Sequence, residues 1–148
     1  AIDVALSGAF GIDLALDKAT AEERAQIADA VKLYKERIRP LVMHGELYRL
    51  VSPYESPLAS LSYVSTDKQK AVVYFYQTKD GNEPRVKLGG LDAHKKYRVE
   101  EVSQAKGVTS RFPANGKVFT GAELMEKGLE NPLNTQFESA VLILIANN

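Results

Sequence analysis

The sequence contains no cysteine, no tryptophan and only two histidines, His44 and His94. The absence of cysteine excludes a disulfide framework and every thiolate metal site. It does not settle the compartment, because many secreted proteins also lack cysteine. The two histidines do not have the HxxxH spacing of a zinc-binding pair. We therefore predict neither a metal nor another cofactor.

The chain has no net charge, because nineteen Lys and Arg residues balance nineteen Asp and Glu residues. Nucleic-acid binders usually carry a basic excess, since neutralisation of phosphates supplies much of their affinity. The basic residues are also scattered among acids. No nucleic-acid partner is expected.

Long hydrophobic runs are missing as well. A membrane-spanning helix needs about 20 consecutive apolar residues. The longest apolar run is AVLILIA near the C-terminus, which predicts a buried strand instead. The N-terminal AIDVALSGAFG lacks the positively charged region of a signal peptide. We expect no membrane partner.

The composition that remains is typical of a soluble globular protein, with 45% hydrophobic and 26% charged residues. A chain of 148 residues can form one domain with a full core. Its first forty residues predict a short strand at 2–6, a Gly-rich turn (SGAFG) and a helix. The helix begins at Thr20, because Glu23 completes a capping box, and Pro40 is expected to end it. One apolar stripe follows a helical spacing: Ile27, Val31, Tyr34 and Ile38.

The chain after Pro40 has a different pattern, in which short apolar runs alternate with turn signals. Seven strands are predicted, at 47–51, 58–65, 71–77, 84–88, 97–102, 108–112 and 139–146. A short helix interrupts them, because Thr120 and Glu123 form a second capping box and Gly128 suits a C-terminal cap. The predicted fold is mainly β, an antiparallel β-sandwich-like domain preceded by a single strand–helix unit.

That single strand–helix unit poses a problem, because one such unit cannot bury its own apolar faces. Residues 1–40 were either cut from a larger α/β domain or fold onto the sandwich. Both alternatives stay open on pattern alone. The apolar stripe would self-associate in the first case and dock on the sheet in the second.

Catalytic motifs are absent from the sequence. GxSxG and P-loop patterns do not occur. Ser7 and Gly8, in SGAFG, form either a tight turn or a loop at the mouth of an α/β barrel, where active sites gather. Nothing distinguishes the acids Glu46 and Glu55, or the pair Asp13 and Asp17, from solvated surface charges.

The aromatic residues give no sign of a sugar-binding platform. Such platforms most often use Trp, which is absent. Tyr63, Tyr74 and Tyr76 lie inside predicted strands, where core packing is expected. Arg49, between Leu47 and Val51 on one strand face, is expected to form an ion pair at a domain boundary.

The segment HGELYRLVSPYES, residues 44–56, closely resembles a segment near the C-terminus of family 36 glycoside hydrolases, the α-galactosidases. VALSGAFGIDLAL resembles the last barrel strand and its loop, although Ile12 and Asp13 stand where Tyr and Glu are more usual. ATAEERAQIADAVKLYKERIRPLV resembles the final barrel helix. Three further stretches resemble the sheet domain that closes the family's chain: VSTDKQKAVVYFYQ, LGGLDAHKKYRVEE and FTGAELMEKGL. The resemblance is collinear over essentially the whole chain.

This resemblance implies a parent enzyme with an N-terminal β-sandwich, a (β/α)₈ barrel and a C-terminal antiparallel domain. The family removes terminal α-galactosyl residues with retention, which requires two carboxyl groups about 5–5.5 Å apart. Both catalytic aspartates of the family lie upstream of this region, so no catalytic residue is assigned here. Ser7 and Gly8 are the only substrate-proximal candidates.

The resemblance divides the chain into residues 1–40, the last strand–helix unit of the barrel, and residues 41–148, the C-terminal β-domain. Its partner is then the rest of the parent enzyme, and it meets the galactoside only through that parent. A start at Ala1, within a predicted strand, favours a fragment that is inactive alone. The location would be cytoplasmic for a bacterial parent. The alternative is an independent β-sandwich module that binds carbohydrate or a protein without catalysis.

Overall fold

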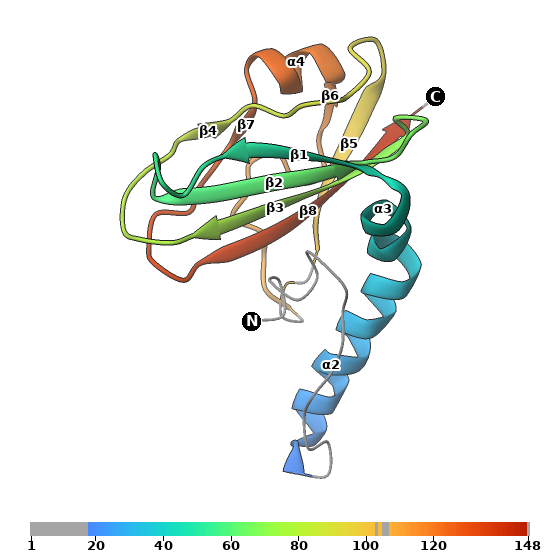
Figure 1. The fold of residues 1–148 in the computed structure, drawn as a ribbon. Helices are drawn as coiled ribbons and strands as arrows, with labels where there is room; N and C mark the ends of the chain where they lie inside the picture. Colours follow the sequence, from blue (N-terminus) through green and yellow to red (C-terminus); the bar gives the residue numbers. More distant parts are fainter. Residues whose placement is uncertain (1–17, 103, 105–106, 148) are drawn as a thin grey trace.

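The computed structural model describes residues 18–102, 104 and 107–147. A long helical segment comes first, followed by strands and one short helix (Figure 1). The helical elements are α2 (Ala21–Leu33), the π-helix η2 (Tyr34–Ile38), α3 (Arg39–His44) and α4 (Gly121–Glu126). The strands are β1 (Glu46–Val51), β2 (Leu58–Val64), β3 (Lys70–Gln77), β4 (Arg85–Val86), β5 (Lys96–Val102), β6 (Val118–Thr120), β7 (Leu129–Glu130) and β8 (Ser139–Asn147).

Six of the strands form one antiparallel sheet in the order β1-β2-β3-β8-β5-β6. Strand β8 lies in its middle, pairing with β3 on one side and β5 on the other. Strands β4 and β7 form a separate two-stranded ladder. The prediction of a mainly β, antiparallel fold is confirmed.

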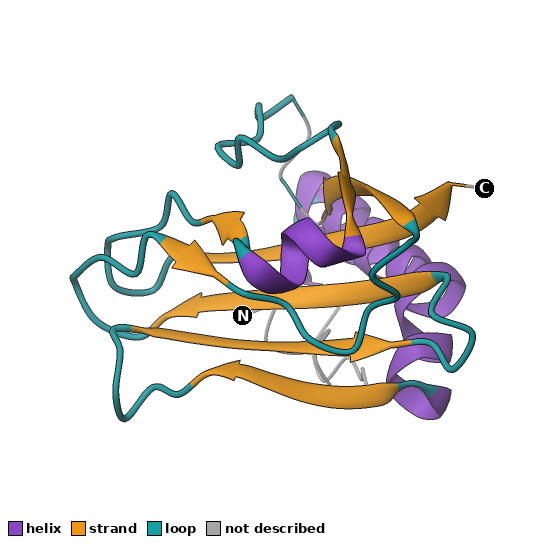
Figure 2. Cartoon of the chain, turned by 90° about the horizontal axis from the view of Figure 1, so that it is seen from above, coloured by secondary structure: helices purple, strands orange, loops and turns teal. Residues whose placement is uncertain are grey.

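The larger core lies on the face of the sheet that carries α4 and the small ladder (Figure 2). Alternate residues of the strands point into this core, as the burial pattern of β2 shows. Phe75 from β3 meets Phe112 with ring centroids 5.0 Å apart. The Leu88 N–H donates to the Leu124 carbonyl at 3.0 Å, which ties α4 to the chain that follows β4.

The opposite face is covered by the C-terminal half of the long helical segment. Tyr34, Ile38 and Leu41 are buried in a second core against the central strands. The sheet contributes Val72, Tyr74, Val102, Val141 and Ile143 to this core. Because both of its faces are covered, β3 is buried along most of its length rather than at alternate residues.

The helical segment begins as predicted but ends later. Thr20 accepts a hydrogen bond from the Glu23 N–H at 3.1 Å, and the Glu23 carboxylate accepts one from the Thr20 N–H at 2.9 Å. The expected end before Pro40 is wrong, because the helix continues to His44. In the π-turn of η2 the Arg39 N–H bonds to the Tyr34 carbonyl, and Pro40 then lies in the first turn of α3, where a missing N–H is tolerated.

Among the strands, the prediction at 108–112 is wrong, because these residues form no ladder. The Ser110 hydroxyl donates to the Glu101 carboxylate and accepts the Phe112 N–H at 3.2 Å. This local bonding replaces strand pairing. The predicted strand at 84–88 shortens to β4, and the short strands β6 and β7 were not predicted.

A close approach joins the helical segment to the sheet at Gly45. A Cβ atom built there would lie 2.4 Å from the Leu41 carbonyl oxygen and 2.9 Å from that of Val64. Glycine therefore lets the chain turn from α3 directly into the edge strand β1.

Candidate functional site

The predicted substrate-proximal residues Ser7 and Gly8 lie outside the described residues, as do Asp13 and Asp17. The predicted first strand, at 2–6, lies outside them too. The barrel origin of residues 1–40 therefore stays a prediction.

Two of the acids considered from the sequence, Glu46 and Glu55, lie within the described chain. Glu46 is exposed on β1 and accepts a hydrogen bond from the Tyr48 hydroxyl at 3.0 Å. Glu55 is exposed in the following turn. No group of three or more potential metal ligands occurs among the residues that the structure describes. None of the described helices is long and apolar enough to cross a membrane.

The segment HGELYRLVSPYES, residues 44–56, packs against a second motif of the sequence, LGGLDAH. The Tyr48 ring lies over Gly89 and Gly90, where a Cβ atom on Gly90 would be 2.2 Å from the ring carbon that carries the hydroxyl. Gly90 also has a φ of +73°, which favours glycine. The hydrogen bond to Glu46 raises the pKa of Tyr48, and burial adds to the rise. This contact is structural, since it joins β1 to the chain before β5.

The predicted role of the strand tyrosines in packing is confirmed. Tyr74 is fully buried, with Tyr63 edge-on at 6.4 Å and Tyr76 stacked at 6.2 Å between ring centroids. Arg49 is exposed on β1. It is not among the ion pairs of the described residues, which are Arg37–Glu100, Arg85–Glu130 and Arg111–Glu138.

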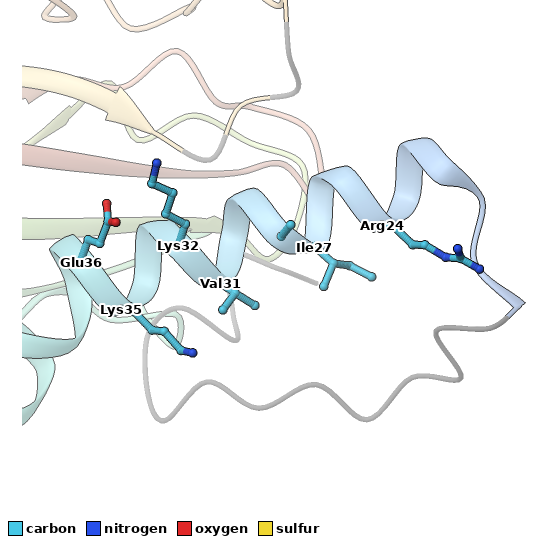
Figure 3. A pocket seen from close by; sticks show the side chains of 7 residues that line it. Arg24, Ile27, Val31, Lys32, Lys35 and Glu36 are labelled. Carbon is cyan, nitrogen blue, oxygen red and sulfur yellow. The ribbon is translucent and has the colours of Figure 1, made fainter.

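The best candidate for a functional surface is one side of the long helical segment. The N-terminal half of α2 extends beyond the sheet (Figure 1). Seven residues of α2 and η2 line a groove of about 710 Å³ (Figure 3). Ile27, Val31 and Lys35 point to the same side of the helix in this groove. A further groove of about 450 Å³ follows along the helix and shares Lys35 with the first.

The two grooves are lined by apolar and basic side chains, and we call the basic ones the cationic rim. Their apolar residues are Ile27, Ala28, Val31, Pro40 and Met43. Their basic residues are Arg24, Lys32, Lys35, Arg39 and His44, against a single acid, Glu36. We call this surface the outer helix face. It suits an apolar protein surface that carries carboxylates better than it suits a small polar substrate.

Only part of this surface is predictable from the sequence. Ile27 and Val31 belong to the predicted stripe, but Tyr34 and Ile38 of the same stripe face the sheet instead. The cationic rim was not predicted. The available signal was the recurrence of basic residues at positions 24, 32, 35 and 39, at spacings that share one side of a helix.

Comparisons with known proteins agree on one family. Residues 58–144 match the family described as the glycosyl hydrolase family 36 C-terminal domain. A probable alpha-galactosidase G from Aspergillus terreus is 30% identical over 142 residues, which cover 94% of this chain and 18% of that protein.

Two solved structures show the same fold. The family 36 alpha-galactosidase AgaB from Geobacillus stearothermophilus superposes with a TM-score of 0.81 at 33% identity, covering 99% of this chain and 19% of that one. The variant A355E D548N of AgaA from the same organism, solved in complex with raffinose, gives a TM-score of 0.80 at 31% identity with the same coverage. The chain thus spans less than one fifth of the relatives that it matches. It belongs to glycosyl hydrolase family 36, and it corresponds to the C-terminal portion of those enzymes.

Proposed function

We propose that this chain is the C-terminal part of a retaining α-galactosidase and that its own role is structural. The chain supplies the C-terminal β-domain and, through residues 1–40, the last strand–helix unit of the catalytic barrel. The parent enzyme hydrolyses terminal α-galactosides with a pair of carboxyl groups that lie upstream of this chain. We expect the chain alone to be inactive, because the family resemblance places both catalytic carboxyl groups upstream of it and a retaining mechanism needs both.

The observation that carries this proposal is the division of the long helical segment. One half is anchored in the sheet through Tyr34 and Ile38, and the other extends beyond the sheet with an apolar surface. A helix fixed at one end can hold a second body in a defined position relative to the β-domain. The upstream barrel is that body. The barrel surface that contacts the outer helix face is expected to be apolar and to carry carboxylates, because these would pair with the cationic rim.

A complementation experiment tests the proposal. The 148-residue chain is co-expressed with AgaB from which the matching C-terminal part has been removed, and turnover of a chromogenic α-galactoside is measured. We expect no turnover from either piece alone and measurable turnover from the pair. Absence of turnover from the pair, while full-length AgaB is active, would contradict the structural role. Turnover by the purified chain alone would contradict its inactivity.

Charge reversal at the rim sharpens the experiment. Lys35→Glu with Arg39→Glu should reduce the restored activity at least about tenfold, because each new carboxylate faces like charges across a contact. The matched control is Lys117→Glu, which changes an exposed lysine before β6 that lines neither groove. An equal loss in the control would show a general effect of charge, so the outer helix face would not be the contact.

A further inference from the structure

At the end of the sheet away from α3, three loops lie together (Figure 1). They comprise residues 52–57 before β2, residues 78–84 after β3 and residues 131–138 before β8. Two aromatic side chains on these loops are almost completely exposed, Tyr54 at 95% and Phe137 at 87%. No role has been assigned above to either residue.

The backbone of Phe137 is in an unfavourable conformation. Its φ of +73° lies in the left-handed region, which a bulky L-residue rarely occupies. Such conformations persist only where the surrounding structure enforces them, and they concentrate at functional sites. Burial of the ring does not compensate here, since the ring projects into solvent. A ligand contact would explain why a phenylalanine rather than a glycine stands at this position.

Hydrogen bonds between the loops fix the backbone around Phe137. The Phe137 N–H donates to the Gln77 carbonyl at 2.8 Å, next to the end of β3. The Gly81 N–H donates to the Asn134 carbonyl at 3.0 Å, and the Gln136 N–H donates to Asp80 Oδ1 at 2.9 Å. These bonds join the second loop to the third.

The loop that bears Tyr54 is attached to the same framework. The Ser56 hydroxyl donates to Glu83 Oε2 at 2.8 Å, and the Thr78 N–H donates to the Pro57 carbonyl at 2.8 Å. The Tyr54 N–H also bonds to the Ser52 hydroxyl oxygen at 3.3 Å. Both rings are therefore presented by a preorganised surface, which lowers the entropy cost of binding.

Glu138 stabilises the third loop, residues 131–138, through hydrogen bonds within that loop. Its Oε1 atom accepts the N–H groups of Asn134 and Thr135 at 3.0 and 2.7 Å, and its carboxylate pairs with Arg111. Burial opposes ionisation, but these two N–H groups and the Arg111 guanidinium together hold the pKa of Glu138 below its usual value. The carboxylate is thus charged near neutral pH and keeps the loop closed.

The surroundings of the two rings distinguish between kinds of partner. No other large hydrophobic side chain on these three loops is exposed. Most exposed neighbours are polar, and two are prolines, Pro53 and Pro84. The polar ones are Ser52, Glu55, Thr78, Lys79, Asp80, Asn82, Asn134, Thr135 and Gln136. The core of a protein interface is depleted in charged residues. A pyranose ring, by contrast, has a C–H face that stacks on an aromatic ring and hydroxyl groups that bond to amides and carboxylates.

We propose that Tyr54 and Phe137 form a non-catalytic contact surface for an oligosaccharide with a terminal galactosyl residue. The strands that carry the two loops, β2 and β8, flank β3, so they lie about 10 Å apart at a spacing of about 4.8 Å per strand. A ligand that contacts both loops must bridge this strand separation, which favours an oligosaccharide over a single sugar. The inference rests on the proposed function only for the choice of galactosides as probes.

The test is a titration of the ¹⁵N-labelled 148-residue chain followed by NMR. Raffinose is expected to shift the amide signals of residues 52–57 and 131–138, with a dissociation constant on the order of millimolar, since only two rings stack. Methyl α-D-galactopyranoside should bind more weakly. Mannitol, an acyclic polyol without a pyranose face, should cause no shift.

Variants separate ligand binding from a structural role. Phe137→Gly removes the ring at a position that suits glycine, so the fold should be retained or stabilised while the affinity for raffinose falls about three- to tenfold. Tyr54→Ala should cause a similar loss, and Phe137→Tyr should retain binding. The matched control is Leu47→Ala, which removes an exposed apolar side chain on β1 and should leave the affinity unchanged.

Three outcomes would overturn the inference. The first is the absence of shifts with raffinose in the unaltered chain, and the second is binding that survives in the Phe137→Gly, Tyr54→Ala double variant. The third is a concentration-dependent change in the same signals without sugar, together with dimerisation in sedimentation, which would make the surface a protein interface. None of these outcomes bears on the complementation experiment, so failure here and failure of the proposed function are distinguishable.

Discussion

The two halves of the long helical segment share one amphipathic pattern but have different environments. In the C-terminal half, Tyr34 and Ile38 are 5% and 0% exposed against the sheet. In the N-terminal half, Ile27 and Val31 are half-buried and line a groove on the outer helix face. The difference arises because the N-terminal half of the helix extends past the sheet (Figure 1).

The two parts of one apolar stripe therefore have different neighbours. The part over the sheet stabilises the β-domain, since burial of each large apolar side chain contributes about 1.5–3 kcal/mol. The part beyond the sheet lies outside the second core, and its surface is the proposed contact for the barrel. Of the two alternatives left open by the sequence, docking on the sheet is realised at Tyr34 and Ile38. The origin of residues 1–40 in a larger α/β domain stays a prediction. Self-association through the remainder stays a prediction.

The largest expected effect comes from removing a buried side chain in the anchored half. Ile38→Ala should lower the free energy of unfolding by about 2–5 kcal/mol, because it deletes apolar contacts and leaves a cavity in the second core. Urea unfolding followed by circular dichroism measures this change.

Ile27→Ala is the matched control for that substitution. It removes the same atoms from the outer helix face and should cost less than about 1 kcal/mol. Equal losses in the two variants would mean that both halves of the helix stabilise the β-domain, and the contrast between them would disappear.

The features that were predictable from the sequence are the local ones. The capping boxes at Thr20 and Thr120 depend on residues only three positions apart, and both form as expected. The division of the stripe was not predictable, because it depends on where the sheet ends, which is a property of the whole fold. Helix continuation through Pro40 was missed for a related reason, since the preceding π-turn is stabilised by packing of Tyr34 and Ile38 on the sheet.

Errors in the strands have an equally physical cause. Residues 108–112 have a β-like composition, but Phe112 alone is buried there, while Val108 is 58% exposed. Strands as short as β6 and β7 carry too few residues for a periodic signal. The exposure of Tyr54 and Phe137 could not be read from sequence, because an aromatic residue next to Pro or to charged and amide residues is compatible with either a core or a loop position.

A smaller effect distinguishes the two capping boxes. Both threonines accept the N–H of the glutamate three residues on at 3.1 Å. Thr120→Ala should lower the global stability by about 0.5–2 kcal/mol, because α4 packs in the main core through Leu124. Thr20→Ala should leave global stability nearly unchanged and instead increase amide exchange in the first turns of α2.

Urea unfolding and native-state hydrogen exchange on both variants measure these two quantities. Thr→Ser at each position is the control, since serine keeps the capping oxygen. A global loss for Thr20→Ala as large as that for Thr120→Ala would show that the protruding half of the helix is coupled to the core.

The smallest expected effect concerns the ion pair that links the anchored half to the sheet. The Arg37 Nη2 atom lies 3.1 Å from Glu100 Oε2 on β5. Both side chains are partly exposed, at 32% for Arg37 and 51% for Glu100. Solvent screens a pair of this kind, so Glu100→Gln should lower the free energy of unfolding by at most about 1 kcal/mol. The loss should shrink at 1 M salt, where the Debye length falls to about 3 Å. Urea unfolding at low and high salt provides the measurement.

Glu36→Gln is the control, because it removes an exposed charge of the same sign from the neighbouring helix position. A loss for Glu100→Gln that is unaffected by salt would mean that Glu100 acts through packing, and the anchoring of the helix would then rest on apolar contacts alone.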